Sequence, residues 1–472
     1  MGKHTVTKVL VVGGGPAGSV AATALAREGL DVVLVEKARF PRYHVGESLT
    51  PSCFAILDAI GVADKLDRHG FLPKHGATFH WDADTWNVDW GTQVGSRAWQ
   101  VDRAAFDHLL LEHARDNGVD VTTEVAVTDV SFTGGRPVSV RCVPSGGKSY
   151  VIDDFDFLID ATGRTGLLSA RTLRNRRPLE NLRNIAAWSY WADADLLPGT
   201  PTGGINVISS PEGWYWVIPL AQGRSGIGYV TSKDAFARHR RRHTATDAIY
   251  HHLIRASPLI NGLTASARHL GPVRVETDYS YIADEFSGPG YLTVGDAACF
   301  LDPLLSTGVH LALFSAFTAA ACVASLHRGE VTEPEALGFF EHTFRRAYTR
   351  LFALVSVMYE RYIGQDGFFR TSDRLIHGTA TRRDDAASDR AFADVISGLP
   401  DLREATDATA RILTDRLIRE ALDAQHRSIT TDHGPGRPDF AAVLNNPLNE
   451  AASARHRLVT TPRLGLRPIP PA

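Results

Sequence analysis

The sequence predicts an α/β fold with more than one domain, and three observations lead to this prediction. A chain of 472 residues is longer than a single hydrophobic core usually supports. The first sixty residues place an apolar strand, an Ala-rich helix and a second strand in succession, as in a parallel sheet. Beyond residue 180, short strands separated by Pro and Gly turns indicate a second, mostly antiparallel sheet.

The N-terminal segment carries the fingerprint of a Rossmann-type dinucleotide-binding unit. Residues 9–12 form an apolar strand, an Ala-rich helix ends near Gly29, and a second strand over residues 31–35 closes on Glu36. The loop between strand and helix has the G-x-G-x-x-G spacing. Its glycines are Gly13, Gly15 and Gly18.

Each glycine of this loop has a physical role. Gly13 permits the tight turn, Gly15 lets the backbone approach a pyrophosphate, and Gly18 lets helix and strand pack closely. The helix N-terminus faces the phosphates with unpaired N–H groups. Glu36 lies where an acid accepts hydrogen bonds from ribose hydroxyls. The fingerprint predicts a dinucleotide site but leaves NAD and FAD open.

Composition argues against several classes of protein. The chain is 44% hydrophobic with a formal net charge of -3, so it has no basic excess for nucleic acid. Its four cysteines lack C-x-x-C spacing, which predicts neither a metal site nor a disulfide framework and fits a reducing cytoplasm. No signal-peptide core precedes the first strand, so we expect a cytoplasmic protein. The apolar run at residues 309–326 approaches membrane-spanning length, but its histidine and small residues favour a packed internal helix.

Three later stretches favour FAD over NAD. "VDRAAFDHLLLEHA" places Arg103 at the start of a helix, "DFLIDATGRTG" ends a strand in a turn, and "GYLTVGDAACF" ends another at Gly295 and Asp296. In this order they resemble the FAD monooxygenase superfamily of the para-hydroxybenzoate hydroxylase fold. The resemblance implies that Arg103 contacts the phosphate or ribityl region of the flavin and that Asp296 holds the ribityl chain. No second G-x-G-x-x-G unit follows, which is compatible with a flavin reduced by a separate flavin reductase.

The stretch "EGWYWVIPL" at residues 212–220 narrows this resemblance. In a strand, Trp214 and Trp216 point to the same face. With Ile218 and Pro219 they resemble the W-x-W-x-I-P signature of the flavin-dependent halogenases. The resemblance implies that the two indoles separate the flavin from the organic substrate, which prevents hydroxylation. The alternative is that both tryptophans are simply core residues.

The segment "RHGFLPKHGATFHW" at residues 68–81 resembles the halogenase segment with the essential lysine, which corresponds to Lys74. An ammonium group polarises hypohalous acid by hydrogen bonding, and a neutral amine forms a chloramine with it. A buried lysine shifts its pKa readily, so both forms are accessible. The alternative is an ordinary solvated lysine.

The segment "DPLLSTGVH" at residues 302–310 opens a helix after the Gly-Asp turn, where backbone N–H groups face an anion. By resemblance, Thr307 and Gly308 bind chloride or bromide, and Ser306 belongs with the catalytic residues. The alternative is that Ser306 or Thr307 merely caps the helix. Tryptophan halogenases have a glutamate just before Ser-Thr-Gly, whereas this chain has Leu305. The sequence therefore resembles the phenol/pyrrole branch, whose substrates are activated by their own heteroatom.

The predicted cofactor residues also include part of "FPRYHVGESLTP", which matches the family and is expected along the isoalloxazine ring. The complete cofactor set is Gly13, Gly15, Pro16, Ala17, Gly18, Glu36, Lys37, Gly46, Glu47, Ser48, Arg103, Gly295, Asp296 and Pro303. The predicted catalytic residues are Lys74, Trp214, Trp216 and Ser306. The predicted halide ligands are Thr307 and Gly308, and no metal is expected.

The expected fold is a Rossmann-type FAD-binding domain with an interleaved, mostly antiparallel β-sheet substrate domain and a C-terminal helical region. We expect the FAD-binding domain to comprise residues 1–75, 100–180 and 275–330, and the substrate-side sheet residues 76–99 and 181–274. Residues 331–430 are expected to be helical and to cover the substrate pocket. Residues 431–472 are expected to form an extended or partly disordered tail.

The resemblance implies a halogenase that uses FADH2, O2 and chloride or bromide to make hypohalous acid. Lys74 would then relay the halogen to a phenol or pyrrole in natural-product biosynthesis. Its partners would be a flavin reductase and an aromatic small molecule or an acidic carrier protein bearing it, with no nucleic acid and no membrane. The basic runs at residues 171–178 and 238–243 are either docking sites for such a carrier or solvated surface. The alternatives are an FAD-dependent aromatic hydroxylase and a non-catalytic FAD-binding partner of a synthase.

Overall fold

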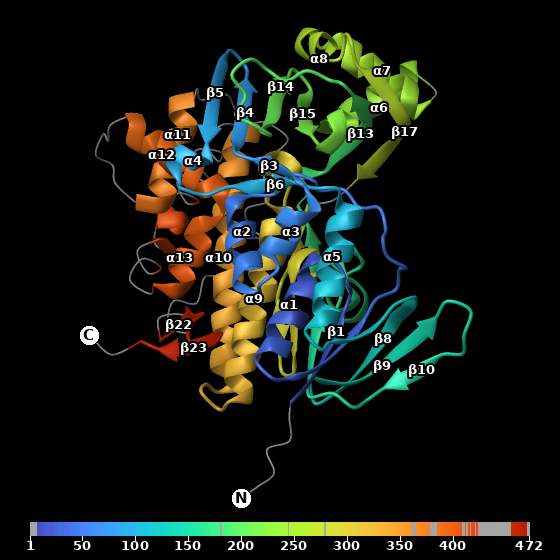
Figure 1. The fold of residues 1–472 in the computed structure, drawn as a ribbon, viewed down its shortest axis with the longest axis vertical. Coiled ribbons are helices and arrows are strands. Elements are labelled where there is room, and N and C mark those ends of the chain that lie inside the picture. Colours follow the sequence, from blue (N-terminus) through green and yellow to red (C-terminus); the bar gives the residue numbers. More distant parts are fainter. Residues whose placement is uncertain are drawn as a thin grey trace, which may run out of the picture.

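The computed structural model of the chain has the α/β architecture that the sequence predicts (Figure 1). Residues 7–469 are described, with gaps at 180–181, 244, 278–279, 361–364, 378–384, 408–410, 412–413, 416, 421 and 423–454. Two large sheets dominate the fold. The helices of the C-terminal region run along one side of the molecule. A small sheet of β8 (Val125–Thr133), β9 (Arg136–Pro144) and β10 (Tyr150–Ile152) lies on the opposite side.

The first large sheet is the Rossmann sheet, and all its pairings except β19–β20 are parallel. In spatial order its strands are β19 (Ser287–Gly288), β20 (Tyr291–Thr293), β11 (Phe157–Asp160), β1 (Lys8–Val12), β2 (Asp31–Val35) and β7 (Asp120–Thr122). The strands are nearly continuous apolar runs because helices cover them. The covering helices are α1 (Pro16–Arg27), α5 (Arg103–Asp116) and α9 (Gly308–His327).

Small residues allow α1 and α9 to approach each other closely. Both helices are rich in alanine, and the alanines that they bury include Ala21, Ala22, Ala316 and Ala320. Of the helices described, α9 alone has the length and apolarity to cross a membrane, yet 89% of its most apolar 18-residue stretch is buried inside the protein. It is the internal helix that its small residues predict.

The loop before α1 shows why glycine is needed in it. Pro16 begins the helix, and Gly13 has φ 110°, a region that favours glycine. A Cβ added to Gly18 would lie 1.8 Å from the carbonyl oxygen of Gly13. The helix therefore sits directly against the loop, as the third glycine of the fingerprint predicts.

The second large sheet joins residues from two distant parts of the chain. Its strands, in spatial order, are β17 (Arg268–Thr277), β13 (Asn184–Ala192), β16 (Arg224–Ser232), β15 (Gly213–Pro219), β14 (Ile205–Ser210), β4 (Gly76–Trp81) and β5 (Asp84–Asp89). Only β14 and β4 pair in parallel. Along β15, Trp214 and Trp216 join one hydrophobic core, whereas Tyr215 and Val217 join another. The helices that cover this second core are α6 (Lys233–Arg242), α7 (Thr246–Ala256) and α8 (Pro258–Leu263).

The remaining strands form smaller sheets. One antiparallel sheet contains β8 (Val125–Thr133), β9 (Arg136–Pro144) and β10 (Tyr150–Ile152). Another contains β12 (Arg176–Pro178), β18 (Tyr281–Ala283) and β21 (Cys299–Phe300). A two-stranded ladder pairs β3 (Leu72–Lys74) with β6 (Ala98–Gln100). The short helices nearby are α2 (Pro51–Ala59), α3 (Ala63–His69) and α4 (Trp90–Gln93).

The C-terminal region is helical where it is described. Its helices are α10 (Glu333–Glu360), α11 (Gln365–His377), α12 (Asp385–Ser397) and α13 (Leu399–Thr406). The expected extended or partly disordered tail falls partly outside the described residues, since 431–454 belong to a gap. The described part forms an antiparallel pair, β22 (His456–Val459) and β23 (Gly465–Pro468), which packs against α9.

We predict that Gly18→Ala lowers the free energy of unfolding by about 1–3 kcal/mol or more, because the new methyl group collides with the backbone of Gly13. Chemical denaturation of the purified variant measures the change. Gly262→Ala in α8 is the matched control, because a Cβ there meets no atom within 4 Å. This control should be neutral or slightly stabilising. Equal stability of wild type and Gly18→Ala would contradict the prediction.

Candidate functional site

A cavity of about 550 Å³ is lined by residues from both large sheets, from α1 and α9, and from β8. Most of the predicted site residues line it. They are Gly13, Gly15, Pro16, Ala17, Glu36, Lys37, Gly46, Glu47, Ser48, Arg103, Trp216, Asp296, Pro303, Ser306 and Gly308. The remaining predicted residues are buried outside its lining. These are Gly18, Lys74, Trp214, Gly295 and Thr307.

One corner of the cavity is suited to phosphate. No described side chain caps α1, so the N–H groups of its first turn remain available to an anion. The loop is held in place by two hydrogen bonds: Gly13 N–H donates to Val35 O at 2.8 Å, and Gly14 N–H donates to Glu36 Oε2 at 2.6 Å. This geometry fits the pyrophosphate of a dinucleotide.

Glu36 is buried at the edge of the same corner. Its second carboxylate oxygen, Oε1, accepts a hydrogen bond from Ala38 N–H at 2.7 Å. Because a carboxylate offers about four acceptor positions, Glu36 can still accept bonds from ribose hydroxyls. Lys37, which donates to Thr165 Oγ1 at 2.9 Å, also lines the cavity.

Two arginines share one buried carboxylate beside the cavity. Asp107 Oδ1 accepts from Arg103 Nε at 2.8 Å, and its Oδ2 accepts from Arg42 Nη1 at 3.0 Å. Burial by itself would lower the pKa of Arg103, but the charge and hydrogen bonds of Asp107, together with the charges of Asp296 and Glu47, raise it. The guanidinium of Arg103 therefore stays cationic at the cavity. Arg42 was not among the predicted residues.

The two residues of the Gly-Asp turn, Gly295 and Asp296, have different contacts. Asp296 lines the cavity, and burial raises the pKa of its carboxyl to about 6 although Arg103 and Arg164 oppose the shift. Gly295 instead has a structural contact, because its N–H donates to Ser315 Oγ of α9 at 2.9 Å. The turn is thus anchored to α9 and presents Asp296 to the cavity.

Glu47 is buried, and its carboxyl lines the cavity beside two tyrosines. Burial raises the pKa of Glu47 to about 7, and the Tyr190 hydroxyl donates to its Oε1. The hydroxyl oxygens of Tyr190 and Tyr43 lie 3.3 Å apart, and Trp188 Nε1 donates to the Tyr43 hydroxyl at 2.8 Å. A polar chain therefore runs from the cavity to Tyr43, which is 45% exposed.

Trp214 and Trp216 stand side by side, as their spacing in a strand predicts. Their ring centroids are 5.8 Å apart, and both side chains are buried. Only Trp216 lines the cavity. Trp214 lies behind it and donates from Nε1 to the Tyr359 hydroxyl of α10 at 2.7 Å. The pair, here called the tryptophan wall, is part of the core and at the same time closes one side of the cavity.

Gly228 makes room for this wall. It lies directly across from Trp216 in the β15–β16 ladder and from Trp188 in the β13–β16 ladder. A Cβ at Gly228 would come within 2.1 Å of the indole of Trp216. The ring of Trp216 can therefore lie flat across β16 only because residue 228 has no side chain.

Lys74 ends β3 and is 1% exposed, so it is not an ordinary solvated lysine. Its ammonium donates to Ser48 Oγ at 2.6 Å and to Leu49 O at 2.9 Å, and it lies 4.4 Å from the ring centroid of Trp90. Burial lowers its pKa to about 7. Since Ser48 lines the cavity, the hydroxyl of Ser48 connects the cavity to the Lys74 amine.

The segment before α9 turns sharply at Ser306, which has φ 58° and lines the cavity. Thr307 is the N-cap residue of α9, but its side chain makes no capping hydrogen bond, so the capping alternative is not supported for it. The first-turn N–H groups of this 20-residue helix are therefore free to hold an anion. Leu305 is buried in the core, where tryptophan halogenases would place the glutamate.

Asp302 is a buried carboxyl close to this turn. Burial raises its pKa to about 7, and the Tyr359 hydroxyl donates to both of its oxygens at 3.1 Å. Because Tyr359 also accepts from Trp214, the tryptophan wall and the turn are linked through α10. Sequence reasoning missed this link because its three residues are far apart along the chain.

The cavity as a whole fits FAD. It combines an anion-binding helix start, a carboxylate for ribose, one buried and one half-buried arginine, and a wall of aromatic rings. Within the described residues, no three His, Cys, Asp or Glu side chains are arranged to hold a metal ion.

Other lining residues were not predicted from the sequence. Trp188 of β13 lies with its ring centroid 6.3 Å from that of Trp216, and the alternating aromatics of "NIAAWSYWADA" were the available signal. The basic run at residues 171–178 is not a simple surface patch. Arg171 lines the cavity, and the guanidinium of Arg176 packs 3.9 Å over the ring of Tyr281.

Comparisons with known proteins show what the chain is similar to. The tryptophan halogenase family model matches residues 8–95 and 87–385. The chain is 40% identical over 406 residues to a tryptophan 2-halogenase of Chondromyces crocatus, covering 85% of this chain and 77% of that protein. It is 33% identical over 480 residues to the sulochrin halogenase of Aspergillus terreus, covering 93% and 86%. Its fold is similar to the structure of the myxobacterial chondrochloren halogenase, with a TM-score of 0.70, 29% identity and coverage of 84% and 97%.

We predict that Gly228→Ala weakens FAD binding by roughly tenfold, or about 1.4 kcal/mol, because the methyl group displaces the Trp216 indole toward the cavity. Titration of the apoprotein with FAD measures the dissociation constant. The double variant Gly228→Ala/Trp216→Phe should bind FAD more tightly than Gly228→Ala alone, since the smaller ring relieves the collision. An unchanged dissociation constant in Gly228→Ala would show that the wall does not shape the cavity.

The lowered pKa of Lys74 predicts a pH-dependent stability. The unfolded chain keeps the lysine proton up to its ordinary pKa of 10.5, whereas the folded protein releases it above about pH 7. The unfolded state therefore binds more protons between these values, and stability rises with pH across this window. Lys74→Met should be more stable than wild type at pH 6, and the advantage should shrink toward pH 10. Thermal unfolding of both proteins across this range measures the difference, and a pH-independent difference would contradict the assignment.

Proposed function

Because this chain belongs to the tryptophan halogenase family of flavin-dependent halogenases, as its motifs predict, we propose that it halogenates an electron-rich phenol or pyrrole through Lys74. Its cofactor is FAD, used in reduced form with a halide, and a separate flavin reductase is typical of the family. Family membership favours halogenation over the hydroxylase and the non-catalytic alternatives.

The buried amine of Lys74 carries this proposal. Its pKa of about 7 makes both the ammonium and the amine accessible near neutral pH. The amine attacks hypohalous acid and gives an N-halogenated lysine and water; the ammonium instead polarises the acid by hydrogen bonding. In both cases the ring attacks the halogen at a fixed position, and the ring proton leaves to water or to the amine.

In this proposal, other residues bind the halide and keep the aromatic substrate apart from the cofactor. When bound, reduced FAD would supply two of the four electrons that O2 takes up and the halide would supply the other two, so that hypohalous acid and water form. The N–H groups at Thr307 and Gly308 hold the halide beside the cavity. The tryptophan wall keeps the aromatic substrate out of the cavity, and Ser48 marks the place where the cavity and Lys74 meet.

Leu305 supports the choice of a phenol or pyrrole. The indole benzo ring benefits from a carboxylate that accepts the departing proton, and Leu305 cannot do this. A phenol or pyrrole is activated by its own heteroatom and needs this help less. Relatives named for tryptophan and for sulochrin differ in substrate, so the substrate of this chain has to be argued from its own residues.

The substrate is either free or attached to an acidic carrier protein. The run on α6 places Arg240, Arg241 and Arg242 on the surface, where they are exposed. Clustered cations attract an acidic partner and speed its encounter. The carrier-bound form is therefore the version of the substrate to test beside the free one.

We predict halide-dependent incorporation of one or more halogens into a phenol or pyrrole when the protein is mixed with FAD, a flavin reductase, NADH and O2. Mass spectrometry detects the isotope pattern on a panel of rings, offered free and attached to an acidic carrier protein. Lys74→Met should abolish the product while flavin oxidation continues. Lys65→Met, a lysine that pairs with Asp116 on the surface at 2.7 Å, is the matched control and should retain full activity. Full product with Lys74→Met would overturn the role of Lys74, and oxygenated product indifferent to halide would overturn the proposal as a whole.

A further inference from the structure

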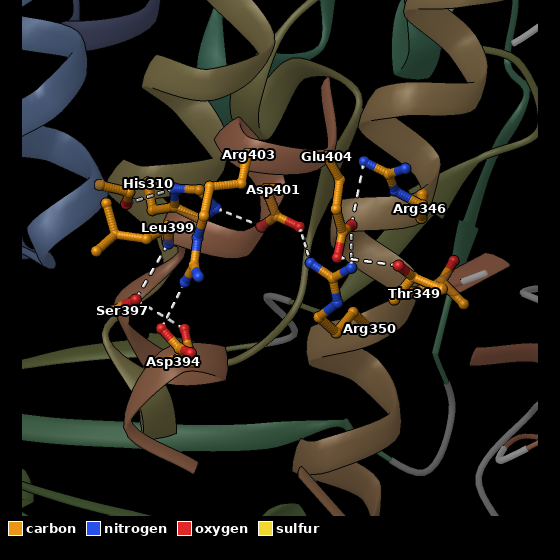
Figure 2. Close-up of polar contacts among 12 residues, drawn as sticks. His310, Arg346, Thr349, Arg350, Asp394, Ser397, Leu399, Asp401, Arg403 and Glu404 are labelled. Carbon is orange, nitrogen blue, oxygen red and sulfur yellow. Dashed lines mark hydrogen bonds and ion pairs between the residues drawn. The ribbon is translucent and has the colours of Figure 1, made fainter. Parts of the chain in front are cut away.

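A buried line of polar contacts crosses the interior between α2, α9 and α13. Ser52 Oγ lies 2.7 Å from His310 Nδ1, and His310 Nε2 lies 2.8 Å from Asp401 Oδ2. Arg350 donates to the other oxygen of Asp401 (Figure 2). All four side chains are at most 2% exposed. Ser52, His310 and Asp401 are called the His310 bridge below.

The residue types of the bridge are those of a hydrolase triad, but its geometry excludes that role. In Ser-His-Asp enzymes, Nε2 faces the serine and Nδ1 faces the aspartate, whereas His310 uses its ring the other way round. Ser52 is 0% exposed, so no substrate reaches its hydroxyl. The bridge is therefore a structural link, and its role depends on which segments its two ends contact.

One end of the bridge meets the segment that holds Lys74. The ammonium of Lys74 donates to Ser48 Oγ and Leu49 O, and Thr50 Oγ1 lies 3.0 Å from Ser52 Oγ. Residues 48–52 thus contact the lysine on one side and His310 on the other. Any movement of His310 is transmitted to the two acceptors of Lys74 through this short stretch of backbone.

His310 also lies in the first turn of α9, two residues after Gly308. The orientation of this first turn decides where its free N–H groups point. Through one side chain, the protein therefore connects the proposed halide-binding turn to the segment that holds Lys74.

The other end of the bridge meets the C-terminal helices. Asp401 belongs to α13 and Arg350 to α10, and Arg350 also donates to Glu404. Burial by itself would raise the pKa of Asp401, but the charge of Arg350, the hydrogen bond with His310 and the charge of Arg346 act together to lower it. A buried ion pair of this kind keeps its geometry only while both partners remain, because an unpaired buried charge is strongly destabilising.

Gly398 lets the backbone before α13 lie against the Ser52–His310 contact. It has φ 71° and precedes α13, and a Cβ there would lie 2.6 Å from Ser52 Oγ and 2.7 Å from His310 Nδ1. The backbone entering α13 is therefore pressed directly against the Ser52–His310 contact. The C-terminal helices cannot shift without displacing the histidine.

We propose that His310 is a positioning residue that fixes the halide-binding turn relative to Lys74, so that hypohalous acid formed at one reaches the other. This inference rests on the roles proposed above for Lys74, Thr307 and Gly308. A misplacement of about 1 Å between reacting groups can lower a rate by roughly a hundredfold. Loss of the bridge should therefore release oxidant without stopping its formation.

The test compares His310→Gln, Ser52→Ala and Asp401→Asn with wild type in a single turnover of reduced FAD with chloride. Three quantities are measured: the rate of flavin oxidation, the halogenated ring product per reduced flavin, and the hypohalous acid trapped in solution by monochlorodimedone. We expect product per flavin to fall about tenfold or more and trapped oxidant to rise, with the rate of flavin oxidation within about twofold of wild type. Ser52→Ala removes one contact and leaves the Asp401–Arg350 pair intact, so it tests the bridge even if His310→Gln does not fold.

Asp394→Asn is the matched control. Asp394 pairs with Arg403 of α13 at 2.5 Å, close to the bridge, but without contact to His310 in the described network (Figure 2). It should behave as wild type in all three quantities. Unchanged product and trapped oxidant in Ser52→Ala and Asp401→Asn would overturn the positioning role, whatever happens to their thermal stability.

Lys74→Met, measured in parallel, separates this inference from the proposed function. Full product with Lys74→Met overturns the role of Lys74, on which the inference rests. No product with Lys74→Met together with full product in the bridge variants overturns the inference alone. Loss of flavin oxidation in the bridge variants would place the bridge in cofactor binding and would also overturn it.

Discussion

The burial of the Lys74 amine is the constraint on which the arrangement of the site depends. An ammonium group in the interior is costly unless donors are matched by acceptors, and here the acceptors are a hydroxyl, a backbone carbonyl and the face of Trp90. These neutral partners do not neutralise its charge, and the pKa falls to about 7 as a result. A carboxylate in the same place would hold the proton and remove the neutral amine from reach.

A single short stretch of chain serves three parts of the site. Residues 46–48 line the cavity, Ser48 and Leu49 hold Lys74, and Ser52 contacts His310 at the start of α9. Because the same backbone takes part in all three, its position is determined by the cofactor side, by the β3–β6 ladder and by the C-terminal helices together. This sharing explains why α10 and α13, which are remote in sequence, matter to a site built mainly by the first 330 residues.

Alternation along β15 separates two kinds of aromatic side chain. Trp214 and Trp216 face the main core, where Trp216 also lines the cavity, while Tyr215 points to the second core beneath α6, α7 and α8. Tyr359 holds Trp214 through a hydrogen bond, and the lack of a side chain at Gly228 leaves room for the indole of Trp216. In the function proposed above, this wall would keep the aromatic substrate away from the flavin.

The sequence by itself determined the fold class and the family, and most of the site residues that it predicted line the cavity. It could do so because the glycine loop, the tryptophan pair and the Ser-Thr-Gly turn are local patterns whose spacing follows from backbone geometry. Tertiary structure alone decided that Trp216 and not Trp214 faces the cavity, that Arg42 joins Arg103 on Asp107, and that Gly295 anchors its turn rather than lining the site. It alone brought Ser52 to His310, 258 positions apart, and His310 to Asp401, 91 positions apart. Such contacts depend on how helices pack against each other, and no local spacing encodes which distant polar groups will meet once they are buried.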